Sequence, residues 1–119
     1  RIVKRIYTLK DYDVSAYKNS ASATVTLESE GKIISDKMSG DGPIDAGFKA
    51  ISSATGQNFK LIDYQVHSVT EGKDALGDAS VKLANGNVQM TGKGISTDVL
   101  EASLIAYLDA TNKLLQMEN

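Results

Sequence analysis

The sequence contains one internal repeat, and this repeat constrains the fold more than any other feature. The pattern L-x-D-Y-x-V at residues 9–14 returns at residues 61–66, an offset of 52. Each half continues with an alternating apolar run: Ala23, Val25 and Leu27, then Ala79, Val81 and Leu83. Matching segments in the same order indicate a duplication, which fixes the architecture of the whole chain. We place the two halves at about residues 1–56 and 57–119.

Glycine-containing segments extend the repeat. The offset of 52 aligns G-D-G at residues 40–42 with G-K-G at residues 92–94, and it aligns Ala50 with Ala102. The alternating runs align instead at an offset of 56. Hairpin loops of different lengths would produce this drift of four residues.

Each half is predicted to contain three strands, because period-two alternation favours half-buried strands. We place the first strand of each half at residues 6–17 and 59–69, and the third at residues 32–38 and 87–91. Asn85-Gly86 predicts a tight hairpin between the second and third strands of the second half.

A helix is predicted to close each half. Pro43 suits the first turn of one helix, and Gly56 suits its C-terminal cap. In the second half, Ser96 or Thr97 is expected to cap the helix start. A face of small residues that would allow close packing is formed by Ala102, Ala106 and Ala110. The predicted fold is α+β: internally duplicated βββα units that form antiparallel sheets with helices on one face.

Composition excludes several classes of function. The chain has 119 residues, a net charge of -2 and arginine only at Arg1 and Arg5, so no basic face for nucleic acid is expected. No apolar run approaches the ~20 residues of a membrane span, and no signal peptide is visible. We therefore expect a cytoplasmic protein with no membrane partner. The first residue is not Met, which suggests a fragment or a processed chain.

Candidate catalytic groups are sparse. The chain has no cysteine and a single histidine, His67, and no carboxylates are spaced to divide acid and base roles. No metal-ligand spacing is visible. We therefore expect no catalytic residues, no metal site and no enzyme activity in this chain alone. The G-x-G turn at residues 40–42 is instead a candidate binding site. Amides at the start of a helix favour an anion such as an amino-acid carboxylate. A tight turn alone would also explain these glycines.

Three motifs resemble one known family. Residues 40–51 are similar to its G-[ND]-G-P-V-D-A-x-F-K-A-I segment, and residues 72–77 to its G-x-D-A-L-G turn. Residues 91–103 resemble its T-G-x-G-[VI]-S-T-D-[IV]-[IL]-E-A-S segment. The family is the C-terminal regulatory domain of α-isopropylmalate synthases and citramalate synthases, and the resemblance covers nearly the whole chain. Residues 1–119 are thus expected to be a single regulatory domain.

The resemblance implies a homodimer that binds a branched-chain amino acid near its interface and inhibits a distant active site. The parent enzyme would condense acetyl-CoA with a 2-oxo acid on a catalytic barrel that uses a divalent metal. That barrel is absent from these residues, so we expect no cofactor in this domain.

The resemblance also implies an effector-binding site. The polar end of the effector is assigned to Gly40, Asp41, Gly42 and Pro43, and its side chain to Ile44, Leu61, Tyr64, Ser68 and Ala75. Leu61 and Tyr64 are three residues apart, so their strand must twist or bulge for both to line one pocket. Ser68 is more polar than the small apolar residue expected at its position.

The identity of the effector has two candidates. The S-T-D string at residues 96–98 resembles isopropylmalate synthases more than citramalate synthases, which tend to carry S-E-N, so leucine is favoured over isoleucine. Burying either side chain contributes roughly 2–3 kcal/mol, and pocket shape would discriminate by only about 1–2 kcal/mol. A dimerisation module that binds no ligand is the remaining alternative.

Overall fold

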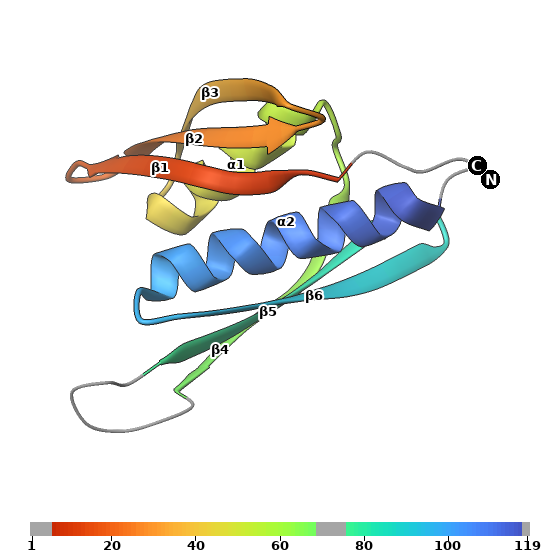
Figure 1. Cartoon of the computed structure of the whole chain (residues 1–119). Coiled ribbons are helices and arrows are strands. Elements are labelled where there is room, and N and C mark those ends of the chain that lie inside the picture. The colour runs from red at the N-terminus through yellow and green to blue at the C-terminus, as the bar shows by residue number, and fades with distance from the viewer. Residues whose placement is uncertain (1–5, 69–75, 118–119) are drawn as a thin grey trace. The chain divides into compact units, whose positions relative to one another are not determined.

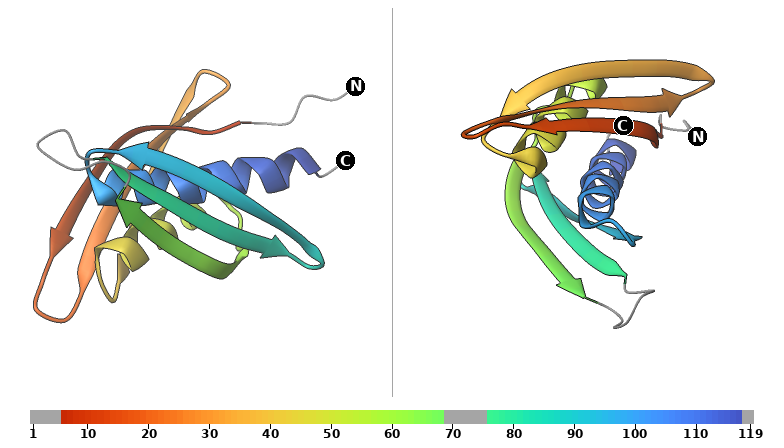
Figure 2. Two further views of the ribbon diagram at one scale, coloured as in Figure 1. Left: turned by 90° about the horizontal axis from the view of Figure 1, so that it is seen from below. Right: turned by 90° about the vertical axis from the view of Figure 1, so that its left-hand side faces the viewer.

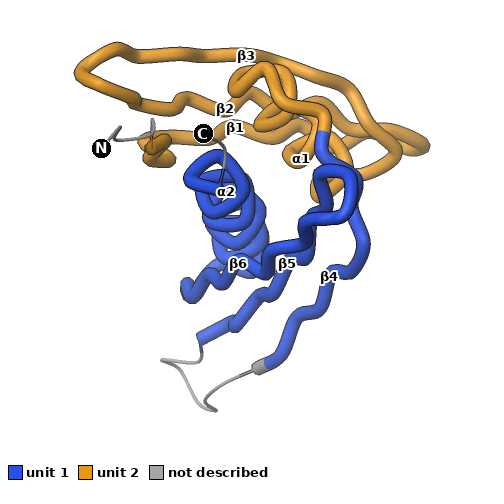
Figure 3. Tube along the Cα trace, turned by 90° about the vertical axis from the view of Figure 1, so that its right-hand side faces the viewer, with its two compact units in different colours: residues 1–4, 59–119 blue, residues 5–58 orange. Residues whose placement is uncertain are grey.

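The computed structural model describes residues 6–68 and 76–117. Its elements follow the order βββα twice (Figure 1). The chain divides into two compact units, residues 5–58 and residues 59–119 with 1–4, which Figure 3 colours separately. Each unit has its own three-stranded antiparallel sheet, so the predicted α+β fold with duplicated βββα units is confirmed.

The first unit is a sheet of order β1-β2-β3 with α1 against one face (Figure 2). Its elements are β1 Thr8–Ala16, β2 Ala21–Ser29, β3 Lys32–Gly40 and α1 Pro43–Thr55. Alternate residues of the central strand β2 are fully buried, because they point to the helix-covered face. The helix ends at Gly56, whose φ of 70° is left-handed and whose amide bonds the Ser53 carbonyl. The predicted C-terminal cap is therefore confirmed.

The second unit repeats this arrangement with order β4-β5-β6. Its elements are β4 Lys60–Ser68, β5 Gly77–Asn85, β6 Val88–Ser96 and α2 Val99–Met117. The helix packs on β5 and β6, and the fully buried residues of β5 are Ala79, Val81 and Leu83. Within residues 6–68 and 76–117, neither helix has the length and apolar character that a membrane crossing requires.

The structure corrects the alignment of the two halves. Gly40 ends β3 as Ser96 ends β6, and Pro43 opens α1 as Val99 opens α2, so these elements correspond at an offset of 56. Only the first strands, β1 and β4, correspond at an offset of 52. Leu9 pairs with Leu27 of β2, and Leu61 pairs in the same way with Leu83 of β5. The alignment of Ala50 with Ala102 is wrong for the same reason.

Loop length explains the change of offset. The connection between β1 and β2 spans residues 17–20, whereas that between β4 and β5 spans residues 69–76, which is four residues longer. The predicted match of residues 40–42 with residues 92–94 is therefore wrong. The first motif ends a strand and opens a helix, whereas the second lies inside β6.

The glycines of β6 let the strand approach the backbone of α2. A methyl group built on Gly92 would lie 2.1 Å from the carbonyl oxygen of Ala106, and one on Gly94 would lie 2.1 Å from that of Ala102. Only glycine permits such an approach. The close packing predicted for the small-residue face of this helix is confirmed.

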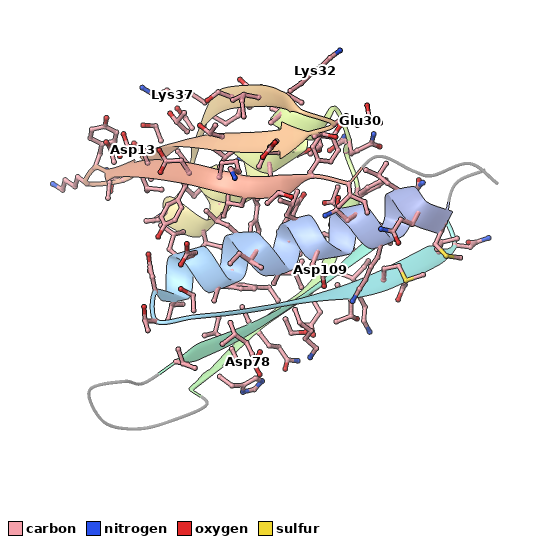
Figure 4. All side chains as sticks on the ribbon, in the orientation of Figure 1. Asp13, Glu30, Lys32, Lys37, Asp78 and Asp109 are labelled. Carbon is pink, nitrogen blue, oxygen red and sulfur yellow. The ribbon has the colours of Figure 1, made fainter. Side chains whose placement is uncertain are left out.

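Polar contacts also tie each helix to the third strand of its own sheet. The Ser53 hydroxyl on α1 donates to the carboxylate of Asp36 on β3. In the second unit, the Lys93 amide on β6 donates to the Asp109 carboxylate at 2.9 Å, and Figure 4 shows Asp109 on the side of α2 nearest that strand. Ser53 and Asp109 are 56 residues apart, so the same helix position serves this purpose in both halves.

Candidate effector-binding site

The turn between β3 and α1 holds five of the predicted site residues. Gly40 is the last residue of β3, and Pro43 and Ile44 are the first residues of α1. Asp41 and Gly42 connect them. The structure therefore brings these five residues together at one end of the first unit.

The two glycines of this turn have different structural roles. A methyl group on Gly40 would lie 2.5 Å from the Ala46 amide nitrogen, so the packing of the helix start against the strand requires glycine. Gly42 has an extended backbone, with φ -163° and ψ 179°, that any residue can adopt. Among the described residues, a methyl group on Gly42 would meet no atom within 4 Å apart from its own chain neighbours. The fold does not require glycine at position 42, and the open space leaves the backbone accessible to another molecule.

The first turn of α1 lacks a side-chain cap. Gly42 is the N-cap residue, and its carbonyl accepts the Ala46 amide at 2.9 Å. It has no side chain to accept a hydrogen bond from the amides of Ile44 and Asp45, which the helix itself also leaves without partners. The helix dipole adds positive potential at the same point. A turn of this kind favours an anion.

Acidic groups flank these amides. The Asp41 amide donates to Oδ2 of Asp45 at 2.9 Å, and the same oxygen lies 3.0 Å from Nζ of Lys49. The hydrogen bond from Asp41, supported by Lys49, lowers the pKa of the Asp45 carboxyl below its usual 3.8, although desolvation opposes the change. The turn thus offers amide donors that suit a carboxylate, and it holds negative charge that suits an ammonium group.

The second unit contains the same turn with its cap filled. Asp98 stands 56 residues after Gly42, and its Oδ1 accepts the Leu100 amide at 3.0 Å. The predicted caps Ser96 and Thr97 are wrong, because both precede the N-cap position. The cap position therefore differs between the two halves: the start of α1 is open at Gly42, whereas the start of α2 is capped by Asp98.

Three further predicted residues lie on β4, where a β-bulge sets the direction of Leu61 and Tyr64. The register of β4 against β5 shifts at Ile62, which is the extra residue of the bulge. As a result, Leu61 pairs with Leu83 and Tyr64 pairs with Val81, on the face of the sheet that carries the core. The bulge needed for Leu61 and Tyr64 to share a face is confirmed.

The exposure of these two side chains differs. Leu61 is 46% exposed, whereas Tyr64 is half-buried and its hydroxyl oxygen lies 2.6 Å from Oγ of Ser103 on α2. Ser103 was not among the predicted site residues. The available signal was a small polar residue among the apolar residues of the helix, at the end of the third family motif.

The remaining predicted residues are only partly described. The backbone of Ser68 pairs with Gly77 at the end of β4, but its side chain lies outside the described residues, as does Ala75. Residues 40–44 belong to the first unit, and Leu61, Tyr64 and Ser68 belong to the second.

The chain is similar to one family model and to several 2-isopropylmalate synthases. The family model described as LeuA allosteric (dimerisation) domain matches residues 2–115. The chain is 44% identical over 112 residues to a 2-isopropylmalate synthase of Ruminiclostridium cellulolyticum, which covers 93% of this chain and 22% of that protein. It is 47% identical over 117 residues to a 2-isopropylmalate synthase of Carboxydothermus hydrogenoformans, which covers 97% of this chain and 23% of that protein. The chain thus spans about a fifth of the length of these relatives.

Proposed function

The chain belongs to the LeuA allosteric (dimerisation) domain family, and from this premise we propose that it binds leucine and transmits feedback inhibition to the catalytic part of a 2-isopropylmalate synthase. The observation that carries the proposal is the uncapped helix start at Gly42. The leucine carboxylate would accept hydrogen bonds from the amides of Ile44 and Asp45, and its ammonium group would face the carboxylate of Asp41.

The leucine side chain requires an apolar surface. Following the family assignment, Ile44, Leu61 and Tyr64 would supply it, together with Ser68 and Ala75. Transfer of a four-carbon side chain from water to such a surface contributes roughly 2–3 kcal/mol. Because isoleucine gains nearly the same amount, shape at the branch point would account for the preference, by about 1–2 kcal/mol.

Inhibition would follow from differential binding. A ligand shifts an equilibrium between two conformations only by the difference of its affinities for them. Typical couplings between sites of about 1–3 kcal/mol correspond to a change of roughly 5–150-fold in affinity. Leucine would therefore bind better to the arrangement of the parent enzyme in which the active site is less effective.

The parent enzyme is also part of the proposal. We expect this domain to form a homodimer, as the family description suggests, and to act without catalysing a reaction. Acetyl-CoA and a divalent metal would bind on the catalytic barrel of the parent, so this domain would hold no cofactor. A biosynthetic enzyme of this kind would work in the cytoplasm.

Calorimetric titration of the chain with leucine and then isoleucine tests the proposal. Saturable binding with a preference for leucine is the expected result. Preference for isoleucine would instead favour the regulatory domain of a citramalate synthase. If neither ligand binds at millimolar concentration and sedimentation measurements show a dimer, the chain is instead a dimerisation module that binds no ligand.

A variant makes the same test specific to the turn. Gly42→Val should weaken leucine binding more than it destabilises the fold, because the new side chain fills space that the described residues leave open. Loss of folding in this variant would mean that glycine serves the turn alone. In the full-length parent, removal of this domain should abolish inhibition by leucine, and unchanged inhibition would reject the proposal.

A further inference from the structure

Two consecutive hydrogen bonds join β4 to the first turn of α2. The Tyr64 hydroxyl oxygen lies 2.6 Å from Oγ of Ser103, and Ser103 donates to the carbonyl of Val99 at 2.8 Å. Ser103 is fully buried. Its hydroxyl has a single proton, which it gives to a carbonyl that can only accept. Tyr64 is therefore the donor in its bond to Ser103.

This direction determines which part of Tyr64 a ligand can meet. The ring begins on the same sheet face as Leu61, and its hydroxyl is directed to α2. With its proton committed to Ser103, the tyrosine presents ring carbons rather than a free donor to a neighbour on that face. An apolar side chain binds poorly against a polar group that would lose its hydrogen bonds, so this orientation suits a branched aliphatic ligand.

We propose that Ser103 is a positioning residue for the effector site. It holds the ring of Tyr64 in the orientation that forms an apolar wall, and it connects this wall to Val99, the first residue of α2. The inference rests on the proposed leucine site and adds a residue to it that does not line the pocket. A ligand that moves Tyr64 would disturb a hydrogen bond at the start of the helix, directly after the Asp98 cap.

The first test is the leucine affinity of Ser103→Ala, measured by calorimetry on the whole chain. Losing one hydrogen bond of this kind should weaken binding about three- to tenfold. Thr111→Val is the matched control, because Thr111 is also buried on α2 and its hydroxyl also bonds the carbonyl four residues earlier, at 3.0 Å. The control should leave leucine affinity unchanged.

A double-mutant comparison separates positioning from general loosening of the helix. In a Tyr64→Phe background, Ser103→Ala should have no further effect on leucine affinity, because the bond it removes is already gone. Tyr64→Phe keeps the bond from Ser103 to Val99, so it tests the same link if Ser103→Ala fails to fold. It should weaken leucine binding to a similar extent.

A spectroscopic signature completes the test. In protein labelled with 3-fluorotyrosine, the fluorine resonance that disappears in Tyr64→Phe belongs to Tyr64. That resonance should move in Ser103→Ala and stay in place in Thr111→Val.

Three outcomes would overturn the inference while leaving the leucine site intact: equal leucine affinity in Ser103→Ala and the unmodified chain, equal losses in Ser103→Ala and Thr111→Val, or a full effect of Ser103→Ala in the Tyr64→Phe background. Absence of leucine binding in the unmodified chain would overturn the proposed function and the inference together.

Discussion

Replacing Gly42 by aspartate should stabilise the fold and abolish leucine binding at the same time. The second half of the chain already shows what aspartate does at this position, because Asp98 caps α2 through the Leu100 amide at 3.0 Å. In Gly42→Asp, the new carboxylate should accept the equivalent amide of Ile44. It would then occupy the place that we assign to the carboxylate of leucine.

The expected magnitudes follow from the geometry of the turn. A cap of this type exceeds glycine by only a few tenths of a kcal/mol, and removing glycine from the unfolded chain adds about 0.4–1 kcal/mol. Repulsion from the charged Asp45 subtracts from this sum. A net gain of roughly 0.5–1 kcal/mol corresponds to an increase of about 2–5 °C in melting temperature. Loss of two hydrogen bonds to a charged group should weaken leucine binding by about 3 kcal/mol or more, beyond 100-fold.

Thermal unfolding followed by circular dichroism and calorimetric titration with leucine are the two assays. Gly42→Ser should also stabilise the helix start and weaken binding, which separates the effect of the cap from that of charge. Asp98→Gly, the reverse change in the second half, should lower the melting temperature and should weaken leucine binding far less than Gly42→Asp does. If Gly42→Asp binds leucine as the unmodified chain does, the uncapped amides do not hold the ligand and the reasoning fails.

Three further predictions concern packing, pH and ligand. Gly94→Ala should destabilise the chain by about 3 kcal/mol or more in denaturant unfolding, because its methyl group would meet helix backbone, whereas Gly42→Ala should change stability by less than about 1 kcal/mol. Asp45 has a lowered pKa in the folded chain, so its stabilisation is present above pH 3.8 and is lost as the pH falls through the folded value. The advantage of the unmodified chain over Asp45→Asn, a few tenths of a kcal/mol at pH 7 for this exposed carboxylate, should therefore vanish in urea titrations below that pH. Leucine at 100 times its dissociation constant should raise the unfolding free energy by about 2.7 kcal/mol, and an unchanged melting temperature would contradict the leucine site.

Local patterns were sufficient to predict the elements of the fold. Alternating residues identified the buried strands β2 and β5, because a strand with one covered face must alternate. Pro43 and Gly56 marked the ends of α1, because each has a backbone preference that suits one end of a helix. These features depend on neighbours in sequence, which is why the sequence alone revealed them.

The correspondence between the two halves could not be predicted, because it depends on pairing between distant residues. Glycine motifs 52 residues apart suggested equivalent turns, but the longer second loop displaces every later element by four residues. The hairpin predicted at Asn85-Gly86 illustrates the same limit, since Asn85 pairs with Val88 and the turn residues are Gly86 and Asn87. The pairing register decides which residues form a turn, and contacts across the sheet fix this register.

The candidate site also has one part that could be predicted from the sequence and one part that could not. Residues 40–44 are consecutive, so the sequence alone was enough to predict that they lie in one turn. Leu61 and Tyr64 were assigned to the site from the family resemblance. The link from Tyr64 to Ser103 joins residues 39 positions apart through side chains, and no sequence pattern encodes it.

The bulges also affect how the sheet edges meet other chains. Lys10 in β1 and Ile62 in β4 each interrupt the regular spacing of hydrogen-bonding groups along a strand at the edge of its sheet. An irregular edge is a poor template for an added strand, which is one way in which sheet proteins avoid uncontrolled association. The opposite edges, β3 and β6, pair with β2 and β5 without a register shift. Aggregation of this chain through strand addition should therefore begin at β3 or β6, and charges placed there should suppress it more than charges placed on β1 or β4.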